Sequence, residues 1–194
     1  MIILIFFFAL LPGVDAYGQS EQSPAQSDRN EAGVRKSGIP DIELIDQDGK
    51  RILFYSLMLK GKTVAINFVY TNCAAFCASQ GAIFAKLQEL LGDKLGKSVN
   101  LITITTDPET DTPERLKSWS EKFKAKPGWT MVTGERQAID EILKALTGDI
   151  GRTGMHSPIV LIGQADNGVW IRDYGLADPE KLAEMIEQVA SGKR

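Results

Sequence analysis

The stretch "NFVYTNCAAFCASQGAIFAKLQ", Asn67 to Gln88, decides the fold of this chain. It begins inside an apolar run, Thr63 to Tyr70, whose β-forming residues predict a buried central strand. Two cysteines separated by three residues follow, and residues 75–91 then predict a helix. In an open α/β sheet, chemistry is expected where the carboxyl end of a strand turns into a helix. Cys73 and Cys77 stand at that position.

The rest of the sequence predicts a mixed sheet around this unit. The predicted helix places Ile83, Leu87, Leu90 and Leu91 on one face. Residues 42–57 alternate and turn at Asp48-Gly49, which predicts a β-hairpin at the front. Further strands are expected within 99–107, 128–134, 157–163 and 166–175, and helices within 111–123, 136–148 and 178–191. The alternation predicts an α/β protein with helices on both faces of a mixed central sheet.

Length and net charge limit the classes of function to consider. The 194 residues suffice for one domain, and the net charge of −3 gives no electrostatic footprint for nucleic acid or anionic membranes. We expect a monomer.

The N-terminus predicts export. Residues 1–11 are apolar, too few for a membrane span of roughly 20 residues, and a small-x-small pattern ends at Ala16. We interpret 1–16 as a signal peptide for the periplasm. No Lys or Arg precedes the run, so an upstream start or an uncleaved anchor remains open. Residues 17–38, polar and without apolar period, predict a flexible linker, and 39–194 the folded domain.

The two cysteines permit several chemistries. If Cys73 and Cys77 shared a helix face, they would lie roughly 5–6 Å apart, which permits a disulfide or two thiolates on one metal ion. The start of the helix favours a thiolate at Cys73 more than at Cys77. A purely structural bridge is the plainer reading in an oxidising compartment, but it would close too short a loop to constrain the unfolded chain much.

The only histidine, His156, precedes the strand predicted at 157–163. A loop before a strand lies at the far end of a parallel sheet, so His156 meets the cysteines only if that strand runs antiparallel. Two thiolates and one imidazole would suit copper, whereas a structural zinc site takes four protein ligands. Met155 is a candidate thioether ligand, with packing as its preferred role.

The segment "TTDPETDTPE" carries Asp107, Glu109, Asp111 and Glu114. We interpret it as the end of a strand and the start of a helix, with Thr112 as N-cap and Pro113 at the first helical position, rather than as an acidic metal patch. Packing roles are expected for Trp119, Trp129 and Trp170. Tyr70 and Phe76 flank the cysteines and are expected to shield them or to contact a partner.

The C-x-x-x-C after "NFVYT", the "TTDPETDTPE" segment and a lone histidine before a strand resemble the Sco/SenC family over residues 39–188. The resemblance implies a thioredoxin-like fold and one copper ion bound by Cys73, Cys77 and His156. Family members assist assembly of the dinuclear copper centre of cytochrome oxidase, by handing over copper or by reducing the acceptor's cysteines.

The sequence departs from the family pattern around the expected ligands. The family commonly has proline after each cysteine and an acidic residue between them, where this chain has Ala74, Ala75, Phe76 and Ala78. It commonly has aspartate before the histidine, where this chain has Met155. A less acidic, more apolar site should favour Cu(I) over Cu(II) and removes a partner for the imidazole.

Three functions follow. The leading one is a periplasmic copper chaperone that acts with copper donor and acceptor proteins, such as a cytochrome oxidase subunit. It would touch a membrane only if residues 1–16 remained as an anchor. The second is a thiol:disulfide oxidoreductase in which Cys73 attacks and Cys77 resolves a reversible disulfide. A peroxidase-like enzyme ranks last because no Arg is close to the cysteines in sequence.

Overall fold

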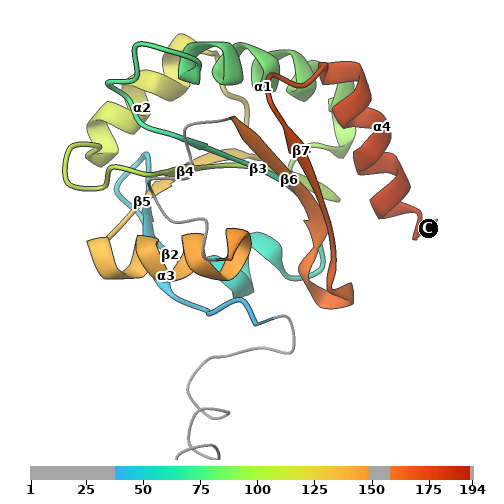
Figure 1. Cartoon of the computed structure of the whole chain (residues 1–194), viewed down its shortest axis with the longest axis horizontal. Helices are drawn as coiled ribbons and strands as arrows, with labels where there is room; N and C mark the ends of the chain where they lie inside the picture. The colour runs from blue at the N-terminus through green and yellow to red at the C-terminus, as the bar shows by residue number, and fades with distance from the viewer. Residues whose placement is uncertain (1–37, 149–157, 193–194) are drawn as a thin grey trace, which may run out of the picture.

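Strand β3 (Thr63–Val69) runs through the core, and all of its residues are buried. In the computed structural model, which describes residues 38–148 and 158–192, it belongs to a seven-stranded sheet of order β2-β1-β5-β4-β3-β6-β7 (Figure 1). The other strands are β1 (Glu43–Asp46), β2 (Arg51–Leu53), β4 (Val99–Thr105), β5 (Trp129–Thr133), β6 (Ile159–Gln164) and β7 (Val169–Tyr174).

Local sequence signals set the helix ends. The α-helices are α1 (Cys77–Leu91), α2 (Pro113–Lys122), α3 (Arg136–Thr147) and α4 (Pro179–Ala190), and the shorter helical turns are η3 (Phe54–Leu59), η4 (Gly92–Lys94) and η6 (Ala165–Asn167). Thr112 accepts the backbone N–H of Arg115 at the start of α2, as the sequence predicted for an N-cap before proline. Gly148, with φ of 75°, ends α3.

The sheet is mixed, and the directions of its strands decide which segments lie near the cysteines. Strands β3, β4 and β5 run parallel, while β6 runs antiparallel to β3, with Asn67 opposite Val160. Strand β7 is antiparallel to β6 and places Tyr174 opposite Ile159. The amino end of β6 and the carboxyl end of β7 therefore lie at the edge where β3 ends.

The helices cover both faces of the sheet (Figure 1). One apolar layer joins η3 and α3 to β3, β4 and β6, through residues such as Phe54, Ile142 and Ile66. The other joins α1, α2 and α4 to the opposite face, through residues such as Phe84 and Leu182. The predicted α/β class, with a mixed sheet between helices and a hairpin at the front, is confirmed.

Two local predictions were wrong in detail. The hairpin turns as expected, with Leu44 opposite Ile52, but β2 ends at Leu53 and residues 54–59 form a π-helical turn instead of continuing the strand. Burial of Phe54, Tyr55, Met58 and Leu59 drives this turn, because a helical turn directs these side chains into the core.

The buried face of α1 also differs from the prediction. It consists of Cys77, Gln80, Gly81, Phe84, Leu87, Gln88 and Leu91. Leu87 and Leu91 were predicted correctly, whereas Leu90 is 42% exposed and Ile83 is only partly buried. Phe84 sets the face, because its ring packs on Trp129 with the centroids 5.7 Å apart.

Several predictions fall outside the described residues. They are the signal peptide at 1–16, the linker at 17–38 except for its last residue, Met155 and His156. Within residues 38–148 and 158–192, none of the helices combines the length and the apolar character that a membrane crossing needs.

Candidate metal and thiol site

Cys73 and Cys77 do not share a helix. Helix α1 begins at Cys77, and Cys73 lies in the turn that follows β3, with its N–H bonded to the carbonyl of Tyr70 at 3.1 Å. The shared helix face that the spacing would give on a helix is therefore not formed, because residues 74–76 bend before the helix starts. The bend still brings the two side chains into hydrogen-bond contact, and both are free thiols.

Cys73 is the more acidic thiol. Its partial burial alone would raise its pKa, but hydrogen bonds to its sulfur outweigh that effect and lower the pKa below its ordinary value. The donors are the thiol of Cys77, the backbone N–H groups of Ala75 and Cys77, and the hydroxyl of Tyr70. One of these, the N–H of Cys77, stands at the start of α1, which agrees with the prediction that the helix start favours a thiolate here.

Cys77 is the protected thiol. Only 1% of its surface is exposed, and burial, together with the hydrogen bond it gives to Cys73, raises its pKa to about 12. The N–H of Tyr70 bonds to its sulfur and opposes that rise. The pair therefore combines an accessible thiol that ionises readily with a buried thiol that stays protonated.

A buried carboxylate, Asp111, holds the turn before Cys73. Its two oxygens lie 3.1 Å from the N–H of Thr71, and it also accepts hydrogen bonds from the hydroxyls of Thr71 and Thr105, the latter at 2.6 Å. Asp111 is 0% exposed. The sequence placed it in a helix-start segment and missed this role, because its partners are 6 and 40 residues away.

The remaining acidic residues of that segment have structural roles, as predicted. Arg136 pairs with Asp107 at 3.6 Å and with Glu109 at 3.1 Å. Glu114 stands in the first turn of α2. Among the described residues, no group of three or more His, Cys, Asp and Glu side chains is placed to hold a metal ion. The predicted third ligand, His156, is not among those residues.

Arg115 was missed because the fold, not the sequence, brings it to the cysteine turn. Its Nε donates to the hydroxyl of Thr71 at 3.1 Å, and its Nη2 donates to the side-chain oxygen of Asn72. Arg115 is therefore close to the cysteine turn in space, although no Arg is close to the cysteines in the sequence. Its donors nevertheless serve Thr71 and Asn72, so this contact positions the turn.

The three tryptophans pack as predicted, and other aromatic side chains lie beside the cysteines. Trp119 and Trp129 are buried, and Trp170 packs against the α3 layer. Phe76 is partly buried against the same cluster as Cys73. Tyr70 is 38% exposed, and two more exposed apolar side chains, Tyr174 and Leu176, follow at the same sheet edge.

A β-sheet of this order, with a thiol pair between its central strand and α1, defines a thioredoxin-like protein. The chain belongs to the SCO1/SenC family, whose model matches residues 31–191. An SCO2-like protein of Rickettsia conorii is 32% identical over 149 residues, 73% of this chain and 69% of the relative. A relative from Stutzerimonas stutzeri, whose name includes the words "copper-binding protein", is 30% identical over 112 residues, 58% of this chain and 53% of its own length.

Solved structures of Sco proteins share the fold. Yeast Sco1 with copper bound superposes with a TM-score of 0.63 at 21% identity, covering 81% of this chain and 97% of that one. BsSco, a member of the Sco family of cytochrome c oxidase assembly proteins in which a disulfide switch was identified, superposes with a TM-score of 0.64 at 22% identity, covering 78% and 92%.

Proposed function

We propose that this protein binds one copper ion through Cys73, Cys77 and His156 and exchanges it with partner proteins. The observation that carries the proposal is the contact between the two free thiols at the carboxyl end of β3. Two thiolates are soft ligands and suit Cu(I), and an added imidazole accommodates Cu(II). Copper bound in yeast Sco1 and the name of the S. stutzeri relative support the choice of metal.

The direction of β6 supports His156 as the third ligand. From the sequence, we expected His156 to lie beside the cysteines only if the strand after it ran antiparallel. Strand β6 is indeed antiparallel to β3. Ile159, the first residue of β6, lies at the edge where β3 ends and the cysteine turn begins. His156 precedes it by three residues, a reach of about 10 Å in extended chain.

The departures from the family pattern set the expected metal preference. The turn between the thiols holds Ala74, Ala75 and Phe76 and carries no charge. The oxygens of Asp111, the buried carboxylate nearby, accept hydrogen bonds from Thr71 and Thr105. We expect tighter binding of Cu(I) than of Cu(II), because few negative groups are left to favour the higher charge.

A second function, thiol:disulfide exchange, is favoured by the unequal thiols. In this function the Cys73 thiolate attacks a partner's disulfide, forms a mixed disulfide and releases one partner thiol. Cys77 then loses its proton and attacks the sulfur of Cys73, which releases the second partner thiol and leaves a Cys73–Cys77 disulfide. The low pKa of Cys73 and the raised pKa of Cys77 suit these roles.

Location and partners complete the proposal. The apolar segment 1–11 supports export to the periplasm, where reversible disulfides form. Acceptors of cytochrome oxidase type are proposed from the family and from the description of BsSco. The exposed Tyr70, Tyr174 and Leu176 offer apolar contact area at the edge that a partner would approach.

Metal competition would test the copper site. Cu(I) and Cu(II) affinities of the reduced protein would be measured against chelators in the wild type, Cys73→Ser, Cys77→Ser and His156→Ala. We expect either serine variant to lose most Cu(I) affinity, and His156→Ala to lose at least about tenfold in Cu(II) affinity and much less in Cu(I). Unchanged Cu(II) affinity in His156→Ala would refute the three-ligand site. Unchanged Cu(I) affinity in both serine variants would leave thiol exchange as the function.

A further inference from the structure

A hollow in the surface lies between the cysteine turn and α2. Its walls are Thr71 from the turn and Arg115, Ser118, Trp119 and Lys122 from the helix, and its volume is about 360 Å³. The four helix residues follow the spacing i, i+3, i+4 and i+7, so they form one stripe along α2. The hollow is joined to the candidate site through Thr71, two residues before Cys73.

The charge of this stripe has a single sign. Arg115 donates to the uncharged oxygens of Thr71 and Asn72. The ammonium of Lys122 lies 5.8 Å from the ring of Trp119 and pairs with no carboxylate among the described residues. Neither cation is neutralised by an acid, so the hollow keeps a positive potential.

Acidic groups near α2 are directed elsewhere. Glu114 and Glu121 are off the stripe, and Lys117, on the same side as these two, pairs with Asp48 of the hairpin at 3.0 Å. Asp111 lies behind the turn, 0% exposed, and its oxygens accept hydrogen bonds from threonines. None of these carboxylates lines the hollow.

The uncharged donors around the hollow are buried or already used, which leaves its two cations to select the ligand. Trp119 lines the hollow, and its buried indole N–H has no acceptor within the described part of the chain. The hydroxyl of Ser118 already donates to the carbonyl of Glu114 at 3.1 Å. The cations of Arg115 and Lys122 are therefore the groups that would receive a carboxylate.

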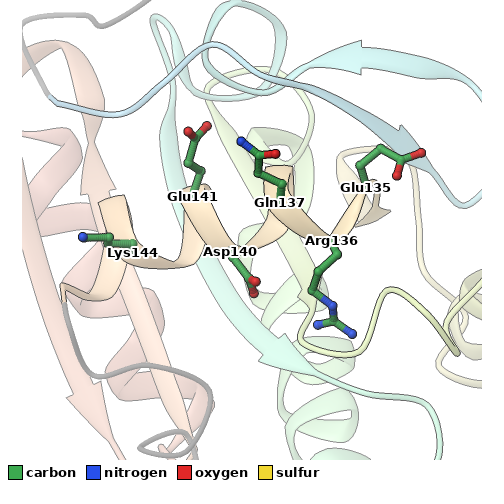
Figure 2. A pocket seen from close by; sticks show the side chains of 6 residues that line it. All are labelled: Glu135, Arg136, Gln137, Asp140, Glu141 and Lys144. Atoms are coloured by element: carbon green, nitrogen blue, oxygen red, sulfur yellow. The ribbon is translucent and has the colours of Figure 1, made fainter.

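The larger surface hollow over α3 makes a useful contrast. Figure 2 shows its side chains arranged along α3, and they are three acids, two bases and one amide. They are Glu135, Arg136, Gln137, Asp140, Glu141 and Lys144. Arg136 already pairs with Asp107 and Glu109. That hollow therefore has no single sign of charge, and it lies on the helix that covers the other face of the sheet.

We propose that the α2 hollow binds Asp or Glu side chains on a segment of the partner protein that reacts with Cys73 and Cys77. The inference rests on the proposed role of the cysteines as an exchange site. Binding an acidic segment here would orient the partner beside Cys73 and speed its encounter with the thiols. We favour a protein segment over a membrane, because the hollow adjoins the cysteine turn that the proposed partner protein must reach.

An NMR titration of the reduced, metal-free full chain would test this. The probe is the peptide acetyl-Glu-Asp-Glu-Asp-amide, with acetyl-Gln-Asn-Gln-Asn-amide as the neutral control. The readout is the indole N–H signal of Trp119, assigned with Trp119→Phe. The Trp129 indole, which donates to Thr103 at 3.0 Å in the core, serves as the internal reference.

We expect a saturable shift of the Trp119 signal with the acidic peptide only. Lys122→Glu should weaken the binding roughly five- to tenfold. Lys97→Glu is the matched control, because Lys97 is also exposed but lies before β4, at the opposite edge of the sheet, and it should leave binding unchanged. Neither substitution touches a thiol.

The outcomes separate the possibilities. No shift, or an equal loss in Lys122→Glu and Lys97→Glu, would overturn the proposal. Equal binding of inorganic phosphate would replace it with a small-anion site, and binding to phosphatidylglycerol vesicles that Lys122→Glu abolishes would replace it with a membrane surface. Copper affinity measured on the same samples keeps the two proposals distinct, since either can fail while the other stands.

Discussion

The two faces of the sheet are built differently. The layer between the sheet and α3 is apolar from η3 to the helix, with side chains such as Phe54, Ile139 and Ile142 at 0% exposure. The layer between the sheet and α1, α2 and α4 is just as buried but contains Cys77 and several polar side chains. The reactive thiol pair borders only the second layer.

Unpaired polar atoms sharpen the contrast. Within the described residues, the buried side-chain atoms without a partner belong to Asn67, Gln80, Trp119 and Thr133. Gln80 lies on the buried face of α1, and Trp119 belongs to the layer under that helix. Along β3 and β5, Asn67 and Thr133 each lie two residues from a member of that layer, so they share its face of the sheet.

The difference indicates where stability and reactivity reside. Burial of apolar area stabilises the α3 layer without conflict, whereas each unpaired buried polar atom costs about 1–3 kcal/mol in the other layer. Functional sites commonly depart from the rules that make a core stable.

Thiol reactivity should differ most. At pH 7.5 we expect Cys73 to react with iodoacetamide at least about a hundredfold faster than Cys77, because only the thiolate is nucleophilic. The rate at Cys73 should rise with pH to a midpoint below that of an ordinary cysteine, since its pKa is lowered. The rate at Cys77 should still be rising at pH 11, since its pKa is about 12. Reduced, metal-free Cys77→Ser and Cys73→Ser proteins isolate the two profiles, and coincident midpoints would contradict the assignment.

Truncation in the apolar layer should have the largest effect on stability. Ile142→Ala removes a fully buried side chain from α3 and should lower the free energy of unfolding by about 3 kcal/mol, from lost burial and the cavity left behind. Urea unfolding followed by circular dichroism measures it.

The matched control for that experiment comes from a wrong prediction. Leu90 was predicted to be in the core and is 42% exposed, so Leu90→Ala should cost less than about 1 kcal/mol. Equal costs for the two variants would mean that the buried face of α1 or of α3 is wrongly placed.

The origin of these errors shows which parts of the fold can be predicted from the sequence alone. Hydrophobic period, the Thr112–Pro113 helix start and the Asp48-Gly49 turn act over a few residues, and they predicted most elements correctly. The face of α1 was misjudged because Phe84 and its contact with Trp129 decide it, and Trp129 is 45 residues further along the chain. The hydrophobic pattern of α1 is compatible with two neighbouring buried faces, and tertiary packing decides between them.

The site divides in the same way. The sequence named Cys73 and Cys77 and the difference in their acidity, because a strand, a turn and a helix start are local features. It could not find Asp111 or Arg115, whose contacts with Thr71 form only when β4 and α2 are in place. Nor could it give the direction of β6, which depends on sheet pairing and decides on which edge the segment before Ile159 begins.

Loss of the buried carboxylate should have an intermediate effect. Asp111→Asn presents an amide donor where Thr71 and Thr105 both donate, and we expect a loss of about 2 kcal/mol in unfolding free energy. Hydrogen exchange at the Thr71 N–H should accelerate, because that bond anchors the turn. Asp107→Asn is the control: Asp107 forms a 3.6 Å ion pair at 37% side-chain exposure, so we expect less than about 1 kcal/mol. Equal losses would remove Asp111 from its positioning role.

Replacing Gln80 should have the smallest effect on the free energy of unfolding. The sign of the change tests whether the side-chain amide of Gln80 is unpaired. Gln80 is 2% exposed, and neither atom of its side-chain amide has a partner. Gln80→Met keeps the length of the side chain and removes both atoms, so the free energy of unfolding should stay within about 1 kcal/mol of wild type or rise. Thermal and urea unfolding of the reduced protein would measure it.

Gln88 supplies a control on the same helix face. It is also 2% exposed, but its amide donates to the carbonyl of Lys124 and accepts the N–H of Lys126, both at 3.0 Å. Gln88→Met leaves two backbone groups without partners and should cost about 2 kcal/mol. If Gln80→Met proves as costly as Gln88→Met, the amide of Gln80 has a partner in solution, such as a buried water molecule. The contrast between the two faces would then be weaker, because Gln80 holds two of the five unpaired buried side-chain atoms among the described residues.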